Sequence, residues 1–179
     1  MMVQNIGVVG AGTMGSGIAQ TCAVNGLSVV MHDMSDELLE KGLKTIEHSL
    51  DRLVAREKLS ESDKSEALGR IRCSTELSAL SASGLVVEAA TENMDIKIPI
   101  FESLNKICDP DAILASNTSS PSLTTLAAAS GRPDKIIGMH FFNPVPLMKL
   151  VEIIRALQTS DKTYEATKSL TRALGKEPI

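Results

Sequence analysis

Three glycines near the N-terminus are spaced as G-x-G-x-x-G, in the run Gly10-Ala11-Gly12-Thr13-Met14-Gly15. Gly10 permits a tight turn, Gly12 lets the backbone approach a pyrophosphate, and Gly15 allows a helix and a strand to pack closely. The N–H groups at the start of that helix would face the anion. This pattern predicts that the turn binds a dinucleotide.

Asp33 follows Gly15 by 18 residues, at the end of the next apolar segment. Its carboxylate would accept hydrogen bonds from the ribose hydroxyls of adenosine and would repel a 2′-phosphate. Met34 and Ser35 offer no guanidinium to such a phosphate, so the sequence predicts NAD rather than NADP. Two alternatives are a turn that binds nothing and a nucleotide fold of the S-adenosylmethionine type. The order of strand, glycines, helix and acidic residue favours the dinucleotide.

His140 lies at the end of another apolar segment, where ligands bind in open α/β sheets. The prolines that follow exclude a helix, and residues 149–154 again have the pattern of a strand. If the chain reverses about Pro146, His140 and Glu152 face one another. A carboxylate that holds a histidine fixes its tautomer and stabilises the imidazolium, as a general base requires. Asn143 lies in the same turn and could donate to a substrate oxygen.

A histidine at a strand end has a structural role more often than a catalytic one. The dinucleotide site nearby favours catalysis for His140. A second polar run, residues 116–121, follows another strand, so its hydroxyls should reach the same crevice. Ser120 before Pro121 suits the N-cap of a helix, which leaves Ser119 to face the ligand.

The segments that carry these residues alternate between strand and helix patterns. Strands are expected at 6–9, 27–31, 85–88, 112–115, 135–139 and 149–154, and helices at 13–25, 36–56, 60–71, 96–108, 122–129 and 162–174. This alternation predicts an α/β fold of the Rossmann type, doubly wound around a mainly parallel sheet, in a single domain over residues 1–179. The two helices between residues 36 and 71 are expected to project as a hairpin.

Composition argues against several classes of protein. The 179 residues include 18 Lys and Arg against 22 Asp and Glu, a net charge of −4, and only four aromatic residues. We therefore expect no nucleic acid partner. Three widely spaced cysteines argue against disulfides and against a metal site. With no signal pattern and no membrane-spanning run, the chain is expected to be cytoplasmic and to have no membrane partner.

Four segments of the chain together match one family. They are the glycine-rich turn and the runs Val87-Glu88-Ala89-Ala90-Thr91-Glu92-Asn93, Ala115-Ser116-Asn117-Thr118-Ser119-Ser120 and His140-Phe141-Phe142-Asn143-Pro144-Val145-Pro146-Leu147-Met148-Lys149-Leu150-Val151-Glu152. Through them the sequence resembles the L-3-hydroxyacyl-CoA dehydrogenases over essentially its whole length. The resemblance implies an NAD-dependent oxidoreductase that interconverts an (S)-3-hydroxyacyl-CoA and the corresponding 3-oxoacyl-CoA.

Position by position, the resemblance implies His140 as the catalytic base and Glu152 as its partner. Ser119 and Asn143 would hold the 3-oxygen of the substrate and the nicotinamide. The implied cofactor-binding positions are Gly10, Gly12, Thr13, Met14, Gly15, Asp33, Glu92, Lys97, Ser119 and Asn143. The implied substrate-binding positions are Ser49, Arg56, Ser119 and Asn143, with Arg56 replacing what is often a lysine.

Arg52 and Arg56 are four residues apart and share one face of the expected helix. Together they could attract the phosphates of an acyl-CoA. A solvated helix face is an equally good interpretation of this pair.

In the family that the sequence resembles, an all-helical domain follows the Rossmann domain and forms a homodimer, and this domain is not expected within residues 1–179. The full-length form is therefore expected to be a homodimer. Three alternatives to the dehydrogenase stay open: an NAD-binding module with little activity, a structural homologue of the crystallin kind, and a sugar-acid dehydrogenase.

Overall fold

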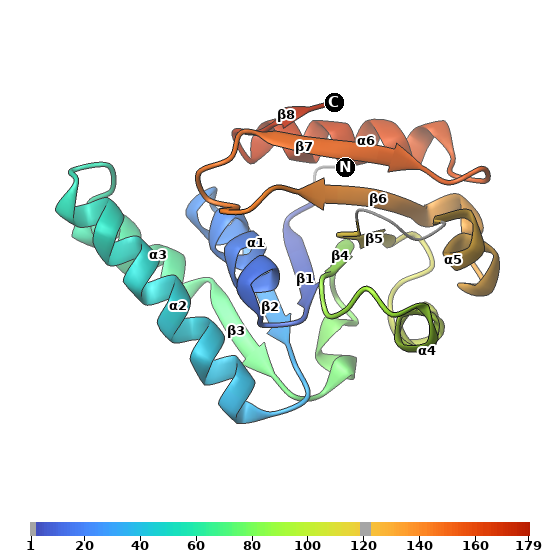
Figure 1. The fold of residues 1–179 in the computed structure, drawn as a ribbon, viewed down its shortest axis with the longest axis horizontal. Helices are drawn as coiled ribbons and strands as arrows, with labels where there is room; N and C mark the ends of the chain where they lie inside the picture. The colour runs from blue at the N-terminus through green and yellow to red at the C-terminus, as the bar shows by residue number, and fades with distance from the viewer. Residues whose placement is uncertain (1–2, 119–122) are drawn as a thin grey trace.

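A computed structural model describes residues 3–118 and 123–179. They form an eight-stranded sheet in the order β3-β2-β1-β4-β5-β6-β7-β8, with helices on both faces (Figure 1). The strands are β1 (Asn5–Val9), β2 (Ser28–His32), β3 (Ile71–Ser74), β4 (Leu85–Glu88), β5 (Ile113–Ser116), β6 (Ile136–Phe141), β7 (Leu150–Arg155) and β8 (Glu177–Pro178). The helices are α1 (Thr13–Val24), α2 (Asp36–Ala55), α3 (Glu61–Gly69), α4 (Met94–Ile107), α5 (Leu123–Ala129) and α6 (Asp161–Ala173), with short 3-10 helices η1 (Leu77–Leu80) and η2 (Pro133–Lys135).

The strand order reverses beside β1, which pairs with β2 on one side and with β4 on the other. From β3 across to β6 the neighbouring strands are parallel. Strand β7 runs antiparallel to β6, and β8 runs parallel to β7. Doubly wound sheets bind their ligands at the carboxyl ends of the strands beside such a reversal, which here are β1 and β4. The predicted Rossmann-type, mainly parallel sheet is confirmed.

The central strands are apolar along their length because helices cover both faces of the sheet. Every residue of β4 and β5 is buried. One core cluster includes Ile18 of α1 and Ile46 of α2, and a second includes Phe101 of α4 and Leu126 of α5. In Figure 1 these two pairs of helices lie on opposite sides of the sheet.

Helices α2 and α3 form the expected hairpin, which projects beyond the sheet (Figure 1). Ser60 and Asp63 form a capping box that begins α3. The buried residues of α2 recur at helical spacing, at Leu39, Gly42, Ile46 and Leu50. A β-carbon built on Gly42 would lie 2.7 Å from the carbonyl oxygen of Ala11. The absence of a side chain at Gly42 therefore lets the first half of α2 pack against the glycine-rich turn.

The predicted helix over residues 60–71 is wrong at its end. Helix α3 stops at Gly69, and residues 71–74 form the edge strand β3, with Ile71 opposite Val29 of β2. A four-residue edge strand shows too little alternation to be distinguished from the end of a helix, so pairing with β2 decides its structure. The other predicted elements all occur, and their ends within the described residues differ by at most two residues; the predicted start of the helix over 122–129 lies outside the described residues.

Candidate active site

The glycine-rich turn has the geometry that its sequence predicts. Gly10 has a φ of +102°, in the region that favours glycine, and its N–H donates to the carbonyl of His32 at 2.8 Å. A β-carbon on Gly15 would lie only 1.8 Å from the carbonyl oxygen of Gly10, so helix α1 could not pack this closely with any other residue there. A β-carbon on Gly12 would meet nothing within 4 Å. The turn therefore leaves open space beside Gly12, at the N-terminus of α1.

Asp33 follows the last residue of β2 and is fixed beside this turn. One carboxylate oxygen accepts a hydrogen bond from the N–H of Ala11 at 2.7 Å, and the other accepts one from Met34 at 2.7 Å. A carboxylate oxygen can accept more than one hydrogen bond. The contacts with Ala11 and Met34 therefore orient Asp33 and leave it able to bind ribose hydroxyls.

His140 and Glu152 are directly opposite residues of β6 and β7, as the predicted reversal requires. The Nδ1 of His140 lies 2.5 Å from a carboxylate oxygen of Glu152. The His140 side chain is 20% exposed and the Glu152 side chain 41%, so the pair is accessible from solvent. The ring of Phe142 packs at 4.9 Å from the imidazole, centroid to centroid. This arrangement holds one imidazole nitrogen and leaves Nε2 for another partner.

Asn117 is a residue of the candidate site to which the sequence patterns assign no individual role. Its side-chain oxygen accepts a hydrogen bond from the main-chain N–H of Phe141 at 2.8 Å. The main-chain N–H of Asn117 donates to the carbonyl of Glu88, also at 2.8 Å. The paired register of β5 and β6 ends at Ser116 and Gly138. The Asn117 side chain therefore continues the hydrogen bonding of the sheet up to the residue beside His140. Its place directly after a strand, at the carboxyl edge, is the sequence signal that could have indicated this role.

The Lys97 side chain is only 1% exposed, and its ammonium forms an ion pair with Glu88 at 2.6 Å. It also donates to the hydroxyl of Ser116 at 3.2 Å, and that hydroxyl donates to the same carboxylate at 2.9 Å. Glu88 is fully buried and accepts a further hydrogen bond from the N–H of Ala90 at 2.9 Å. The structure thus places the Lys97 ammonium against the ends of β4 and β5. Sequence analysis gave Glu88 no role of its own.

Glu92, in the loop after β4, accepts a hydrogen bond from the hydroxyl of Thr118 at 2.5 Å. This contact joins the loop after β4 to the loop after β5. Ser119 and Ser120, together with Pro121, lie outside the described residues. Their expected roles in ligand binding and helix capping stay predictions.

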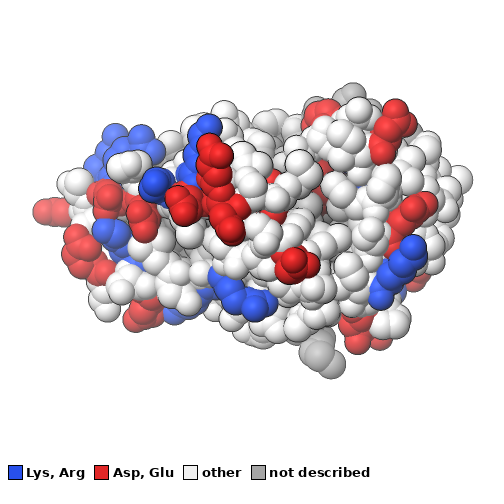
Figure 2. Space-filling model, turned by 90° about the horizontal axis from the view of Figure 1, so that it is seen from below, with Lys and Arg blue, Asp and Glu red and all other residues white. Residues whose placement is uncertain are grey.

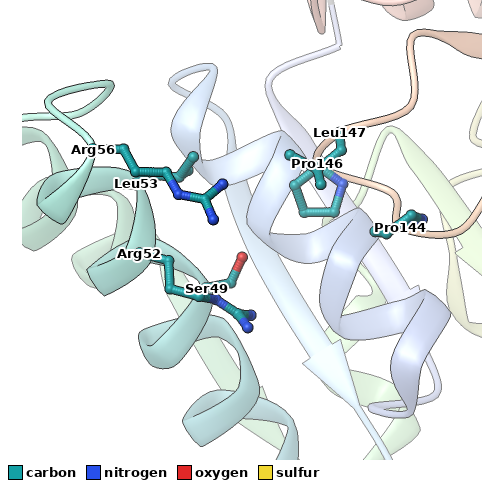
Figure 3. Close-up of a pocket in the computed structure, with 7 residues that line it drawn as sticks. All are labelled: Ser49, Arg52, Leu53, Arg56, Pro144, Pro146 and Leu147. Carbon is teal, nitrogen blue, oxygen red and sulfur yellow. The ribbon is translucent and has the colours of Figure 1, made fainter.

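A pocket lies between α2 and the loop that joins β6 to β7 (Figure 3). Its volume is about 230 Å³, and it is lined by Ser49, Arg52, Leu53, Arg56, Pro144, Pro146 and Leu147. Figure 3 shows the side chains of Ser49, Arg52 and Arg56 directed from the helix toward the loop. Asn143 immediately precedes this wall of the pocket in the chain. The expected substrate-binding positions Ser49 and Arg56 therefore meet in one pocket, next to the loop that carries Asn143.

Acidic and basic side chains are interspersed on the face shown in Figure 2. Within residues 3–118 and 123–179, no three His, Cys, Asp or Glu side chains are grouped so as to hold a metal ion. No helix in the described part of the chain is both long and apolar enough to cross a membrane.

Burial raises the pKa of the Cys22 thiol to about 12, so this thiol is protonated at neutral pH.

Comparison with known families matches residues 5–179 to the model described as 3-hydroxyacyl-CoA dehydrogenase, NAD binding domain. The chain belongs to the 3-hydroxyacyl-CoA dehydrogenase family. This confirms the resemblance found in the sequence, and it confirms NAD as the cofactor of the family's domain. The roles of individual residues stay predictions.

Several relatives carry dehydrogenase names. The probable 3-hydroxybutyryl-CoA dehydrogenase of Deinococcus radiodurans is 50% identical over 97% of this chain and 62% of its own length. The mitochondrial hydroxyacyl-coenzyme A dehydrogenase of Homo sapiens is 43% identical over 100% of this chain and 59% of its own. Among solved structures, the (S)-3-hydroxybutyryl-CoA dehydrogenase from Ralstonia eutropha is 56% identical, with a TM-score of 0.97 over 99% of this chain and 62% of its own. The chain thus spans about three fifths of each of these 3-hydroxyacyl-CoA dehydrogenases.

Proposed function

We propose that residues 1–179 are the NAD-binding domain of an enzyme that interconverts an (S)-3-hydroxyacyl-CoA and the 3-oxoacyl-CoA, with 3-hydroxybutyryl-CoA as the preferred substrate. The observation that carries this proposal is the 2.5 Å contact between His140 and Glu152. It supplies a general base at the edge of the sheet where the glycine-rich turn also lies.

The contact with Glu152 determines how His140 handles a proton. With Nδ1–H donating to the carboxylate, Nε2 carries the lone pair that accepts the proton of the 3-hydroxyl. The carboxylate then stabilises the imidazolium that forms. NAD, which the glycine-rich turn and Asp33 would hold, would supply the acceptor for the hydride of C3, and loss of the proton and the hydride would leave the ketone. In the reverse reaction the His140 imidazolium returns the proton to the oxygen.

Asn143 supports the proposal through its position in the loop that follows β6. Its amide can donate to the 3-oxygen while His140 receives the proton, and it can also contact the nicotinamide. Ser119 is proposed for the same two contacts on the basis of the family resemblance alone. Both residues would orient the C3–H bond for transfer, and orientation of this kind lowers the barrier by reducing the entropy lost on reaction.

The pocket of Figure 3 suits the phosphate-bearing end of coenzyme A. Arg52 and Arg56 line it together and bring two positive charges to one place, although the whole chain has a net charge of −4. A guanidinium can bind a phosphate through two parallel hydrogen bonds, which a lysine at the position of Arg56 would not offer. The Ser49 hydroxyl provides a further hydrogen-bonding group.

Asp33 supports a preference for NAD over NADP, because its fixed carboxylate suits ribose hydroxyls and repels a 2′-phosphate. Titration with NADH and with NADPH, followed by nucleotide fluorescence, tests this point. We expect NADH to bind at least about tenfold more tightly, which corresponds to about 1.4 kcal/mol. Tighter binding of NADPH would contradict the role given to Asp33. Glu92 and Lys97 are proposed as further cofactor-binding positions, with Lys97 acting from its buried place beside Glu88.

The deciding experiment measures oxidation of NADH with acetoacetyl-CoA in the full-length protein and in its His140→Gln variant. We expect the variant to lose at least about 10²-fold in kcat, as removal of a general base does, while its affinity for NADH stays within about twofold. His48→Gln, an exposed histidine outside the proposed site, serves as the matched control. Turnover that survives in His140→Gln would contradict the assignment.

The same assay distinguishes the alternative functions. NADH binding without turnover in the full-length protein would indicate a binding module or a structural homologue, and turnover of a sugar acid would indicate a different dehydrogenase. A cytoplasmic location, a homodimeric full-length form, and the absence of nucleic acid and membrane partners also stay predictions. Light scattering of the full-length protein tests the dimer.

A further inference from the structure

Lys176, between α6 and β8, is a buried lysine with no part in the chemistry proposed above. Its ammonium donates hydrogen bonds to the main-chain carbonyls of Val145 at 2.5 Å and of Met148 at 2.6 Å. Within the described residues, no carboxylate forms an ion pair with it, and burial lowers its pKa. A buried ammonium without a counter-charge is costly, so its two carbonyl contacts must offset that cost.

The end of α6 fixes the position of Lys176. Gly175 has a φ of +67°, and its N–H donates to the carbonyl of Arg172 at 3.0 Å. The N–H of Lys176 donates to the carbonyl of Thr171 at 3.1 Å. These two bonds and the left-handed glycine form a Schellman motif, which ends a helix with a defined backbone. The Lys176 side chain therefore extends from a rigid support.

The loop that receives the Lys176 ammonium connects β6 to β7 and has little regular structure of its own. Within the loop, the N–H groups of Leu147 and Met148 both donate to the carbonyl of Pro144, each at 3.0 Å. The carbonyls of Val145 and Met148 point instead to Lys176. The N–H of Glu177 also donates to the carbonyl of Lys149 at 2.8 Å, so the segment after α6 supports the loop at three main-chain oxygens.

This loop carries two parts of the proposed site. Asn143 lies at its beginning, and Pro144, Pro146 and Leu147 form the wall of the pocket opposite α2 (Figure 3). Lys176 is remote from the pocket in sequence and does not line it. Along the loop, the residues that Lys176 contacts, Val145 and Met148, alternate with the residues that line the pocket. A shift of the carbonyls that Lys176 holds would therefore move both Asn143 and the pocket wall.

We propose that Lys176 is a positioning residue, which holds the loop between β6 and β7 in the conformation that binds the acyl-CoA and places Asn143 at the reacting carbon. The proposal rests on the proposed function for its substrate. Lys176 does not line the pocket; it acts through the Val145 and Met148 carbonyls.

Lys176→Met tests this in the full-length protein, since methionine keeps most of the side-chain length and removes the donors. We expect KM for acetoacetyl-CoA to rise about tenfold and kcat to fall at least about fivefold, while the dissociation constant for NADH changes less than threefold. Lys162→Met, the same substitution at an exposed position of α6, should leave all three constants unchanged. The kcat of each variant is calculated per folded enzyme, and thermal unfolding measures the folded fraction.

A second measurement needs no substrate. In Lys176→Met, amide hydrogen exchange of Leu147 and Met148 should accelerate at least about tenfold, while the amides of β1 keep their rates. Kinetic constants equal to those of the parent, or unaltered exchange at both loop amides, would overturn the proposal. If the parent protein itself fails to oxidise NADH with acetoacetyl-CoA, the proposed function fails, and hydrogen exchange alone decides whether Lys176 holds the loop.

Discussion

Gly17 of α1 lies directly against Val145 of the loop between β6 and β7. A β-carbon built on Gly17 would lie 2.8 Å from Cβ and 3.1 Å from Cγ2 of Val145, closer than side-chain atoms normally approach. Val145 is itself buried. The helix that begins at the glycine-rich turn and the loop that carries Asn143 are therefore packed together at the one residue type that permits it.

Gly17→Ala should consequently force Val145 outward. Overpacking of this kind costs about 1–3 kcal/mol, which exceeds the gain of up to about 1 kcal/mol from replacing a helical glycine. We expect a lower free energy of unfolding in urea and a higher KM for acetoacetyl-CoA. Gly69→Ala is the control, because a β-carbon there meets nothing within 4 Å. Equal stability of the two variants would show that the loop yields to Gly17→Ala without cost.

Glu152→Gln should impair proton transfer by His140 and leave the binding of NADH intact. The amide keeps the shape of the carboxylate but stabilises the imidazolium of His140 poorly, so we expect kcat to fall at least about tenfold. Affinity for NADH should stay within about twofold, because Glu152 lies on β7 and outside the glycine-rich turn. Steady-state kinetics and NADH titration measure the two effects. An unchanged kcat would remove Glu152 from the mechanism; Glu165→Gln, exposed on α6, provides the comparison.

Lys97→Met should be strongly destabilising. It leaves the fully buried Glu88 carboxylate without its cation, and breaking a buried pair from one side costs about 3–5 kcal/mol. Urea unfolding should show this loss, and Lys106→Met, exposed on the same helix, should show almost none. The double variant Lys97→Met, Glu88→Leu should lose less than the single variant. A double variant whose loss equals the sum of the two single losses would mean that the charges are not coupled.

The contact between Asp51 of α2 and Lys64 of α3 should stabilise the folded chain less at acidic pH. Lys64 donates a hydrogen bond to Asp51 at 2.5 Å, and this contact holds the pKa of the Asp51 carboxyl below its usual value of 3.8. A depressed pKa stabilises the folded chain above the unfolded value, and this stabilisation is lost as the pH falls through the folded value. The urea midpoint of Asp51→Asn should therefore fall less than that of the parent between about pH 5 and about pH 2. The urea midpoint of Lys64→Met should change with pH as that of Asp51→Asn does. If the urea midpoints of the parent and both variants fall by the same amount, the prediction is contradicted.

Local patterns in the sequence determined most of the fold. Glycine spacing fixes the turn after β1, because no other residue fits at Gly10 or Gly15. The apolar runs of the central strands identify them, because a covered parallel sheet needs no alternation. The prolines between β6 and β7 locate the reversal, and the pairing of His140 with Glu152 follows from it. Each of these features depends on residues close together in the chain.

Tertiary structure alone decided the features that join distant segments. Strand β3 exists because β2 offers its edge, and the burial of Lys97 depends on Glu88 and Ser116 at the ends of two other strands. Asn117 bonds to Phe141, 24 residues away, and Lys176 bonds to Val145, 31 residues away. A polar side chain is paired or solvated according to what the fold brings beside it, and no local spacing records that. The sequence therefore predicts which residues would do the chemistry, and the fold decides which residues hold them in place.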